Sequence, residues 1–260
     1  RKSGELFLQN IRLKKLAVEY GTPTFIYDSN SIKNSFNLLK SIMDPLNGKI
    51  HFAVKSNDNL GIIKYINSLG AGADVVSIGE LKRCLKVSVK PEDIIFSGVG
   101  KQKDEIEFAI NQNIKQLNAE SIDELKDIIE ISNNIKKTVN VALRVNFDIN
   151  AKTHKKISTG DENSKFGIIY DDIKNACKLI SEASFINPYG LAVHVGSQLF
   201  DYDVFFQTFS KIKKLAIELR NLGYEVNHLD LGGGFGIDYT MENSLNYKSF
   251  SKALNKVFKN

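Results

Sequence analysis

The sequence predicts an α/β protein built as a (β/α)8 barrel. Seven short apolar or β-branched runs alternate with segments of helical periodicity, and most of the runs end in a polar or glycine residue. Serial strand and helix units give a parallel sheet that is buried on both faces. Several functional strand ends are typical of a barrel mouth, whereas an open doubly wound sheet concentrates its site at one switch point. The barrel is therefore favoured over the open sheet, with seven of its eight strands found.

The expected strands follow one another along the whole chain, at 51–55, 73–76, 94–96, 115–118, 139–144, 190–195 and 228–231. Between them the apolar spacing becomes helical, as from Ile62 to Leu69 and from Phe205 to Leu219. The four-residue motifs that begin at Ser77 and Ser121 have the form of a capping box and directly follow predicted strands. Each motif therefore predicts the start of a helix.

Composition excludes several classes of protein. Of 260 residues, 42% are hydrophobic, which is enough for a sizeable core. No run approaches the roughly 18 apolar residues of a membrane span, and no secretory h-region follows the first residues, so a cytoplasmic protein without a membrane partner is expected. Cys84 and Cys177 have no metal-ligand spacing. They are expected to be small core residues, and no metal site is expected.

The net charge of +5 raises the question of nucleic acid. Of the basic residues, 30 are lysine and 5 are arginine, scattered singly or in pairs among acids. No arginine-rich stripe or aromatic RNA motif accompanies them, so no nucleic-acid partner is expected and the charge is interpreted as a solvated face.

One interval, from Arg144 to Val195, is about twice as long as the others. Its middle is polar and contains glycine, from Thr153 to Gly160 and from Ser164 to Gly167. A long loop at the C-terminal end of a barrel strand is usually an active-site loop. A plain surface excursion is the alternative.

Three strand ends carry residues suited to one kind of chemistry. Lys55 ends an apolar strand, and a partly desolvated lysine there would be an amine nucleophile, although a lysine capping a strand in solvent is the simpler reading. His194 could stack on a flat ring and Ser197 could donate to a phosphate, or the histidine could be structural.

A glycine run completes the pattern. Gly232, Gly233 and Gly234 follow a strand and could bring backbone amides to a phosphate, or could form a tight turn without a ligand. An amine, a ring-stacking partner and a phosphate cradle are together what pyridoxal 5′-phosphate requires, and their coincidence favours function over chance.

The motifs resemble those of a known family along essentially the whole chain. They run in order as Tyr20 to Pro23, His51 to Asn57, Gly72 to Leu81, Phe96 to Gly98, Ala142 to Asn146, His154 to Gly160, Lys165 to Gly167, His194 to Gln198 and Leu229 to Gly234. This set resembles the diaminopimelate decarboxylases, which are fold-type III pyridoxal-phosphate enzymes with an alanine racemase-like barrel. The segment from His154 to Gly160 is more similar to the diaminopimelate branch than to the ornithine or arginine decarboxylases.

The resemblance implies a role for each candidate residue. Lys55 would form the Schiff base with the cofactor, His194 would stack on the pyridine ring, and Ser197 with Gly232, Gly233 and Gly234 would hold the phosphate. Asp74 and Arg144 would lie beside the cofactor as positioning groups. The implied reaction, the last step of lysine biosynthesis, is the decarboxylation of meso-2,6-diaminopimelate to L-lysine by a homodimer.

The resemblance also implies a domain division, with an N-terminal segment at 1–30 and the cofactor-binding barrel at 31–260. Family members continue into an eighth strand and a β domain that hold substrate-binding groups and the proton donor, and no such motifs follow Gly236. The barrel is therefore expected to be incomplete, and the 260 residues alone are expected to bind cofactor without turnover. An ornithine or arginine-type decarboxylase and a non-catalytic cofactor-binding homologue are the alternatives.

Overall fold

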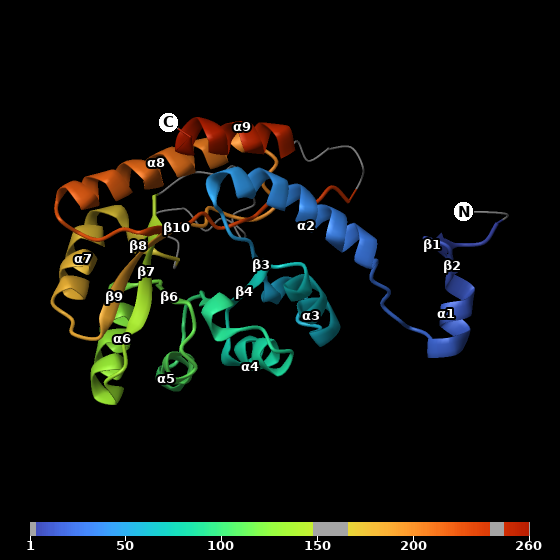
Figure 1. Ribbon diagram of the computed structural model, residues 1–260, viewed down its shortest axis with the longest axis horizontal. Helices are drawn as coiled ribbons and strands as arrows, with labels where there is room; N and C mark the ends of the chain where they lie inside the picture. The colour runs from blue at the N-terminus through green and yellow to red at the C-terminus, as the bar shows by residue number, and fades with distance from the viewer. Residues whose placement is uncertain (1–3, 148–165, 240–246, 260) are drawn as a thin grey trace.

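The centre of the molecule is a curled parallel sheet. A computed structural model describes residues 4–147, 166–239 and 247–259 (Figure 1). The strand order is β10-β9-β7-β6-β5-β4-β3, so the strands lie side by side in the order of the sequence, without a switch point. This order confirms the barrel-type sheet and rules out the open doubly wound alternative. The strands are β3 (His51–Ala53), β4 (Gly72–Val75), β5 (Ile94–Phe96), β6 (Gln116–Ala119), β7 (Val139–Asn146), β9 (Ile186–Ala192) and β10 (His228–Asp230).

Helices cover the outer face of the sheet (Figure 1). Each expected strand is followed by helical structure, as the repeating units predict, and α9 packs along α8. No helix among the described residues is long and apolar enough to cross a membrane. The helices are α3 (Leu60–Ser68), α4 (Ile78–Lys86), α5 (Lys103–Asn111), α6 (Ile122–Ile135), α7 (Ile173–Ser181), α8 (Tyr202–Asn221) and α9 (Tyr247–Phe258).

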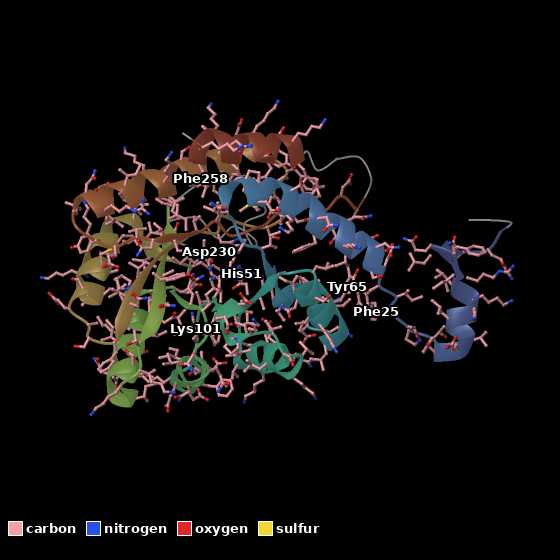
Figure 2. All side chains as sticks on the ribbon, in the orientation of Figure 1. Phe25, His51, Tyr65, Lys101, Asp230 and Phe258 are labelled. Carbon is pink, nitrogen blue, oxygen red and sulfur yellow. The ribbon has the colours of Figure 1, made fainter. Side chains whose placement is uncertain are left out.

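The N-terminal part stands away from the sheet (Figure 1). It consists of a short antiparallel pair, β1 (Phe7–Leu8) and β2 (Ile11–Arg12), followed by α1 (Leu13–Tyr20), which has no buried residue. An extended stretch with a cis Thr22–Pro23 bond then leads to α2 (Ser29–Met43). Phe25 in this stretch is 90% exposed and lies outside the helical shell (Figure 2).

Along the strands, side chains alternate between the apolar core and a polar face of the sheet. In β4, Ala73 and Val75 are buried in the large apolar cluster, whereas Asp74 between them is not part of it. In β6, Leu117 belongs to the same cluster and its neighbours Gln116 and Asn118 do not. Since successive strand residues point to opposite faces, the apolar set packs under the helices and the polar set faces the barrel interior.

Both predicted helix starts are confirmed. The Ser77 hydroxyl accepts from the Glu80 N–H at 3.3 Å, and Ser121 accepts from the Glu124 N–H at 3.1 Å. The reciprocal contacts differ from a standard capping box, because each glutamate accepts from the residue before the cap. Val76 N–H lies 2.9 Å from Glu80 Oε2, and Glu120 N–H lies 3.3 Å from Glu124 Oε1.

Two strands end earlier than predicted, by two and three residues. The strand β3 ends at Ala53, and Val54–Ser56 form a 3-10 turn, η2, because the Asn57 N–H donates to Val54 O at 2.9 Å. The strand β9 ends at Ala192, because its neighbour β10 ends at Asp230. Lys55 and His194 therefore lie beyond their strands, on the loops of the barrel mouth.

The long interval contains one strand that the sequence pattern did not predict. The two-residue β8 (Ile168–Ile169) pairs in parallel with Val145 and Asn146 of β7 and leads through the 3-10 turn η4 (Tyr170–Asp172) into α7. The expected active-site loop, including the motif from His154 to Gly160, lies outside the described residues.

Candidate active site

Four polar side chains form a continuous chain across the barrel interior. Ser97 Oγ donates to Asp74 Oδ1 at 2.6 Å, and Asn118 Nδ2 lies 2.9 Å from Ser97 Oγ and 3.1 Å from Asp230 Oδ2. These residues come from β4, the end of β5, β6 and β10. The interior is therefore held by hydrogen bonds between side chains from both halves of the sheet.

Within this series of hydrogen-bonded side chains, the pKa of Asp74 is shifted by its surroundings. Burial and the neighbouring carboxylate of Asp230 raise the pKa of Asp74 to about 7, against the Ser97 hydrogen bond and the charges of Lys55 and Arg144. A carboxyl group with such a pKa exchanges its proton near neutral pH. Asp74 is thus a candidate for holding or releasing a proton in the site.

Lys55 lies at the mouth, on the turn η2. Lys55 is exposed, which agrees with the simpler of the two interpretations, a lysine that follows a strand in solvent. The reason is that β3 ends before Lys55, which places the side chain on the loop. Its positive charge nevertheless acts on Asp74, Glu80 and His194, whose pKa values it lowers.

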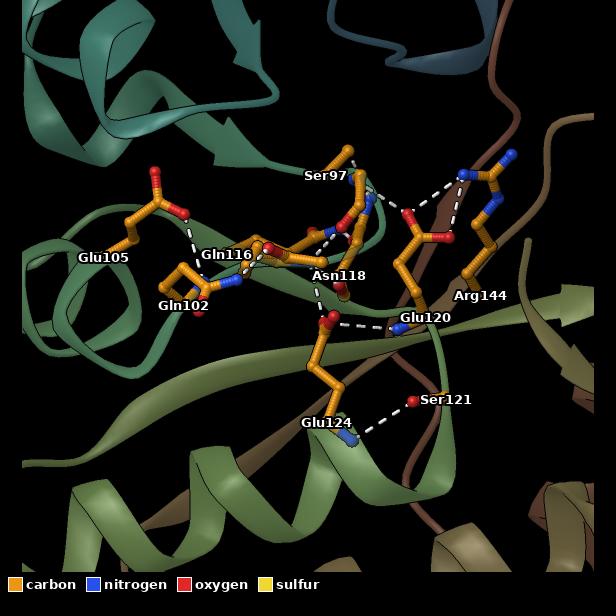
Figure 3. Close-up of polar contacts among 12 residues, drawn as sticks. Ser97, Gln102, Glu105, Gln116, Asn118, Glu120, Ser121, Glu124 and Arg144 are labelled. Atoms are coloured by element: carbon orange, nitrogen blue, oxygen red, sulfur yellow. Dashed lines mark hydrogen bonds and ion pairs between the residues drawn. The ribbon is translucent and has the colours of Figure 1, made fainter. Parts of the chain in front are cut away.

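Arg144, on β7, is held by Glu120, which follows β6 (Figure 3). The guanidinium Nη1 lies 2.9 Å from both carboxylate oxygens of Glu120. Both residues are almost fully buried, at 8% and 2% exposure. The guanidinium also lies 5.0 Å from the centre of the Phe166 ring. Its charge acts to lower the pKa values of both Asp74 and His194.

His194 is half-buried by solvent accessibility, and its low pKa keeps it neutral over the ordinary pH range. Desolvation lowers its pKa to about 3, with smaller contributions from Arg144 and Lys55. Its Nδ1 accepts from the Gly233 N–H at 3.3 Å, which joins the imidazole to the glycine loop. An uncharged imidazole presents a flat apolar face, which suits contact with an aromatic ring.

The loops after β9 and β10 run side by side. The Leu199 N–H donates to Gly234 O at 2.9 Å, and the Gly236 N–H donates to Leu199 O at 3.0 Å. The side-chain amide of Gln198 bonds the backbone of Ile237 in both directions. Ser197 lies exposed in the first of these loops. The structure thus brings Ser197, His194 and the glycine run to one corner of the mouth.

The three predicted glycines have different structural roles. A Cβ at Gly232 would lie 2.3 Å from Val193 O, and one at Gly234 would lie 2.0 Å from Gly196 O. Both residues also have positive φ, of 67° and 96°. A Cβ at Gly233 would meet nothing within 4 Å. The outer two glycines are therefore needed for the loop itself, and only Gly233 borders open space.

The two cysteines take no part in the site. Cys84 and Cys177 are buried free thiols, 0% and 8% exposed, as predicted. Burial raises the pKa of Cys84 to about 12 and that of Cys177 to about 11, so both stay protonated. Among the described residues, no group of three histidine, cysteine or acidic side chains is arranged to hold a metal ion.

Several site residues were missed in the assignments made from the sequence. Ser97 contacts Asp74, Glu120 contacts Arg144, and Asp230 Oδ1 accepts from the Gly232 N–H at 3.0 Å. Asn118 joins Ser97 to Asp230. The sequence signal that could have found these residues is a polar residue at or just beyond the end of a strand, at a position whose side chain points into the barrel. Ser97 lies 23 positions from Asp74, Glu120 lies 24 from Arg144, and Asp230 lies 112 from Asn118, so these pairings depended on the curl of the sheet.

Comparison with known proteins gives a consistent result. The chain is 39% identical over 252 residues to diaminopimelate decarboxylase of Neisseria meningitidis serogroup B, covering 97% of this chain and 61% of that protein. A crystal structure of diaminopimelate decarboxylase from Helicobacter pylori complexed with L-lysine superposes with a TM-score of 0.91 at 35% identity, covering 95% of this chain and 63% of that one. The crystal structure of diaminopimelate decarboxylase from M. jannaschii in complex with L-lysine superposes with a TM-score of 0.91 at 34% identity. The match covers 98% of this chain and 61% of that one.

The chain thus spans about three fifths of the length of these relatives. The family model described as "Pyridoxal-dependent decarboxylase, pyridoxal binding domain" matches residues 29–260, which include every strand of the curled sheet. The chain belongs to the pyridoxal-dependent decarboxylases, of which it contains the pyridoxal binding domain.

Proposed function

We propose that the chain is the cofactor-binding part of a diaminopimelate decarboxylase, which converts meso-2,6-diaminopimelate to L-lysine and carbon dioxide. The observation that carries the proposal is the convergence of Lys55, Asp74, Arg144, His194 and the glycine loop at one barrel mouth. The names of the relatives support the substrate, and so do the L-lysine complexes of two of them.

The residues present fit pyridoxal phosphate. The open space beside Gly233 is bounded by backbone that Gly232 and Gly234 hold in place, and a side chain at Gly233 would fill it. The Gly232 and Gly233 N–H groups donate within the chain, to Asp230 Oδ1 and His194 Nδ1, so the fit to a phosphate depends on the space beside Gly233 and on the exposed hydroxyl of Ser197. The neutral imidazole of His194 suits the face of a pyridine ring, and Lys55 supplies the amine.

When bound, the cofactor supplies the electron sink that makes loss of carbon dioxide from an amino acid feasible. In this proposal the chain's own residues do the rest. Lys55 Nζ would be the amine that holds the cofactor. The imidazole of His194 would lie against the ring and keep water from it. Asp74 and Arg144 would position the cofactor through its polar groups, and Asp74 can hold a proton at its carboxyl because its pKa is about 7.

Three further properties belong to the same proposal. The whole protein acts as a homodimer in the cytoplasm, as the family resemblance implies. The chain divides into an N-terminal segment at 1–30 and the cofactor-binding barrel at 31–260. Support for the division comes from the N-terminal elements, which stand away from the sheet, and from the family match, which begins at residue 29.

Reductive labelling tests the cofactor assignment. After incubation with pyridoxal phosphate and borohydride, peptide mapping should find the label at Lys55, and Lys55→Ala should remove it. Lys103→Ala is the matched control, because Lys103 is an exposed lysine on the outer helical layer. Label spread over surface lysines and unchanged in Lys55→Ala would refute the assignment.

Product analysis tests the substrate. The whole protein should release lysine from meso-diaminopimelate faster than it releases putrescine from ornithine or agmatine from arginine. Preference for ornithine or arginine would favour another branch of the family, and labelling at Lys55 without any turnover would favour a non-catalytic binding protein.

A further inference from the structure

Arg144 has one nitrogen that the described residues leave without a partner. Its Nη2 is buried and makes no hydrogen bond within the described part of the chain, whereas Nη1 is fully engaged by Glu120. A buried donor that stays unsatisfied is unfavourable, and more so when it is charged. The residue that decides where this donor points is therefore functionally important.

Glu120 is itself fixed more firmly than an ordinary ion-pair partner. Its Oε1 also accepts from the Gly98 N–H at 2.8 Å, on the loop after β5. Its backbone N–H donates to Glu124 Oε1 at 3.3 Å, and this oxygen also accepts from Lys101 Nζ at 2.7 Å. The carboxylate is thus held by a backbone N–H of the loop after β5, and the backbone of Glu120 is held by Glu124 of α6.

The way in which Glu120 binds Arg144 is unusual. A carboxylate commonly meets arginine through two nitrogens, which would engage both ends of the fork. Here both oxygens lie 2.9 Å from the same nitrogen, Nη1. The contact anchors the guanidinium and leaves Nη2 uncommitted, with Phe166 beside the group at 5.0 Å.

We propose that Glu120 is a positioning residue, which holds Arg144 so that Nη2 remains available to an oxygen atom of the ligand bound at the barrel mouth. The inference rests on the proposed cofactor site. Its chemistry requires only a ligand with an acceptor oxygen, which pyridoxal phosphate provides. Glu120 touches no ligand in this arrangement and acts through Arg144 alone.

The test measures the dissociation constant of pyridoxal phosphate by absorbance titration. Glu120→Gln keeps the shape and one acceptor for Gly98 but loses the charge that anchors Arg144. Binding should weaken by about tenfold or more, the range expected for a charge-assisted hydrogen bond. Glu120→Asp keeps the charge on a shorter stem and should recover part of the affinity.

A matched control separates positioning from stability. Glu124→Gln changes another buried glutamate of the same network, one whose ion pair is with Lys101 and not Arg144, and its amide oxygen can still accept from the Glu120 N–H. It should lower the midpoint of thermal unfolding and leave cofactor affinity within about twofold of the parent. Equal weakening by Glu124→Gln and Glu120→Gln would show a structural effect and overturn the proposal.

A double-mutant cycle supplies the decisive outcome. In an Arg144→Met background, Glu120→Gln should have no further effect on affinity, because the guanidinium through which it acts is gone. A further loss of the same size in that background would overturn the proposal. Failure of the parent protein to bind pyridoxal phosphate, or to be labelled at Lys55, would instead count against the proposed function.

Discussion

Asn118 Nδ2 donates to Asp230 Oδ2 at 3.1 Å, although β6 and β10 are separated in the sheet by β7 and β9. In a flat sheet with strands about 4.8 Å apart, these two strands would lie about 14 Å from each other. The contact therefore requires a strongly curled sheet. It also connects Asp74, through Ser97, to the carboxylate that orders the glycine loop, because Asp230 Oδ1 accepts from the Gly232 N–H.

Replacing Asn118 should destabilise the fold. Asn118→Leu would leave Asp230 Oδ2 and Gln116 Nε2 without their partner inside the barrel. We expect a loss of about 2–3 kcal/mol in the free energy of unfolding, measured with urea, because buried polar groups would be left unsatisfied. Asn187→Leu, which breaks an exposed hydrogen bond to Asn140, should cost less than 0.5 kcal/mol, roughly the limit for surface changes. Similar losses in the two variants would contradict this account of the interior.

The glycine loop should show two separable effects. Gly232→Ala and Gly234→Ala place a Cβ within 2.3 and 2.0 Å of backbone oxygens at positive φ, so both should lower the midpoint of thermal unfolding. Gly233→Ala meets no neighbour within 4 Å and should leave that midpoint unchanged while weakening pyridoxal phosphate binding. Fluorescence titration and thermal unfolding measure the two effects. Normal cofactor affinity in Gly233→Ala would mean that the phosphate lies elsewhere.

Asp74 should make stability depend on pH. Its pKa in the fold is about 7, above its ordinary value of 3.8, so the native state binds more protons than the unfolded state between these values. The free energy of unfolding should therefore fall as pH rises from about 4 to about 7, by at most about 4 kcal/mol from this group.

The variant Asp74→Asn isolates that contribution. The amide oxygen can still accept from Ser97, but the group no longer ionises. The variant without cofactor should be more stable than the parent above pH 7, and its advantage should vanish below about pH 4. Exposed Asp104→Asn serves as the control for the substitution itself. A parallel pH profile for parent and Asp74→Asn would show that the carboxyl is not perturbed.

The buried ion pair between Lys101 and Glu124 gives a prediction about stability alone. The two groups lie 2.7 Å apart with side chains 1% and 9% exposed, and Lys101 Nζ also binds Gly98 O and Asn118 O. Lys101→Met should cost about 3–5 kcal/mol by urea unfolding, because it leaves Glu124 buried and unpaired. Adding Glu124→Gln should restore part of this loss.

An exposed pair is the matched comparison for that measurement. Lys40 and Asp44 lie 2.6 Å apart on the surface of α2, one turn from each other. Lys40→Met should change the free energy of unfolding by less than about 0.5 kcal/mol. Equal costs at Lys40 and Lys101 would refute the argument that burial decides the value of the pair.

Local sequence patterns determined the order of the elements. The alternation of β-branched runs with helical spacing predicted the seven strands of the curled sheet, and Ser77 and Ser121 marked two helix starts correctly. These features depend on contacts within about four residues, which the sequence displays directly. The serial order of the units also predicted a barrel-type sheet.

Only the tertiary structure decided which polar residues meet. Asn118 and Asp230 are 112 positions apart, and Glu120 and Arg144 are 24 apart, so no local periodicity links either pair. It also decided that Lys55 is exposed on a turn, because β3 ends early, and that Gly233 differs from the glycines beside it. The physical reason is that hydrogen bonds and close backbone approaches across a barrel depend on its curvature and register, which arise from packing the whole sheet against its helices.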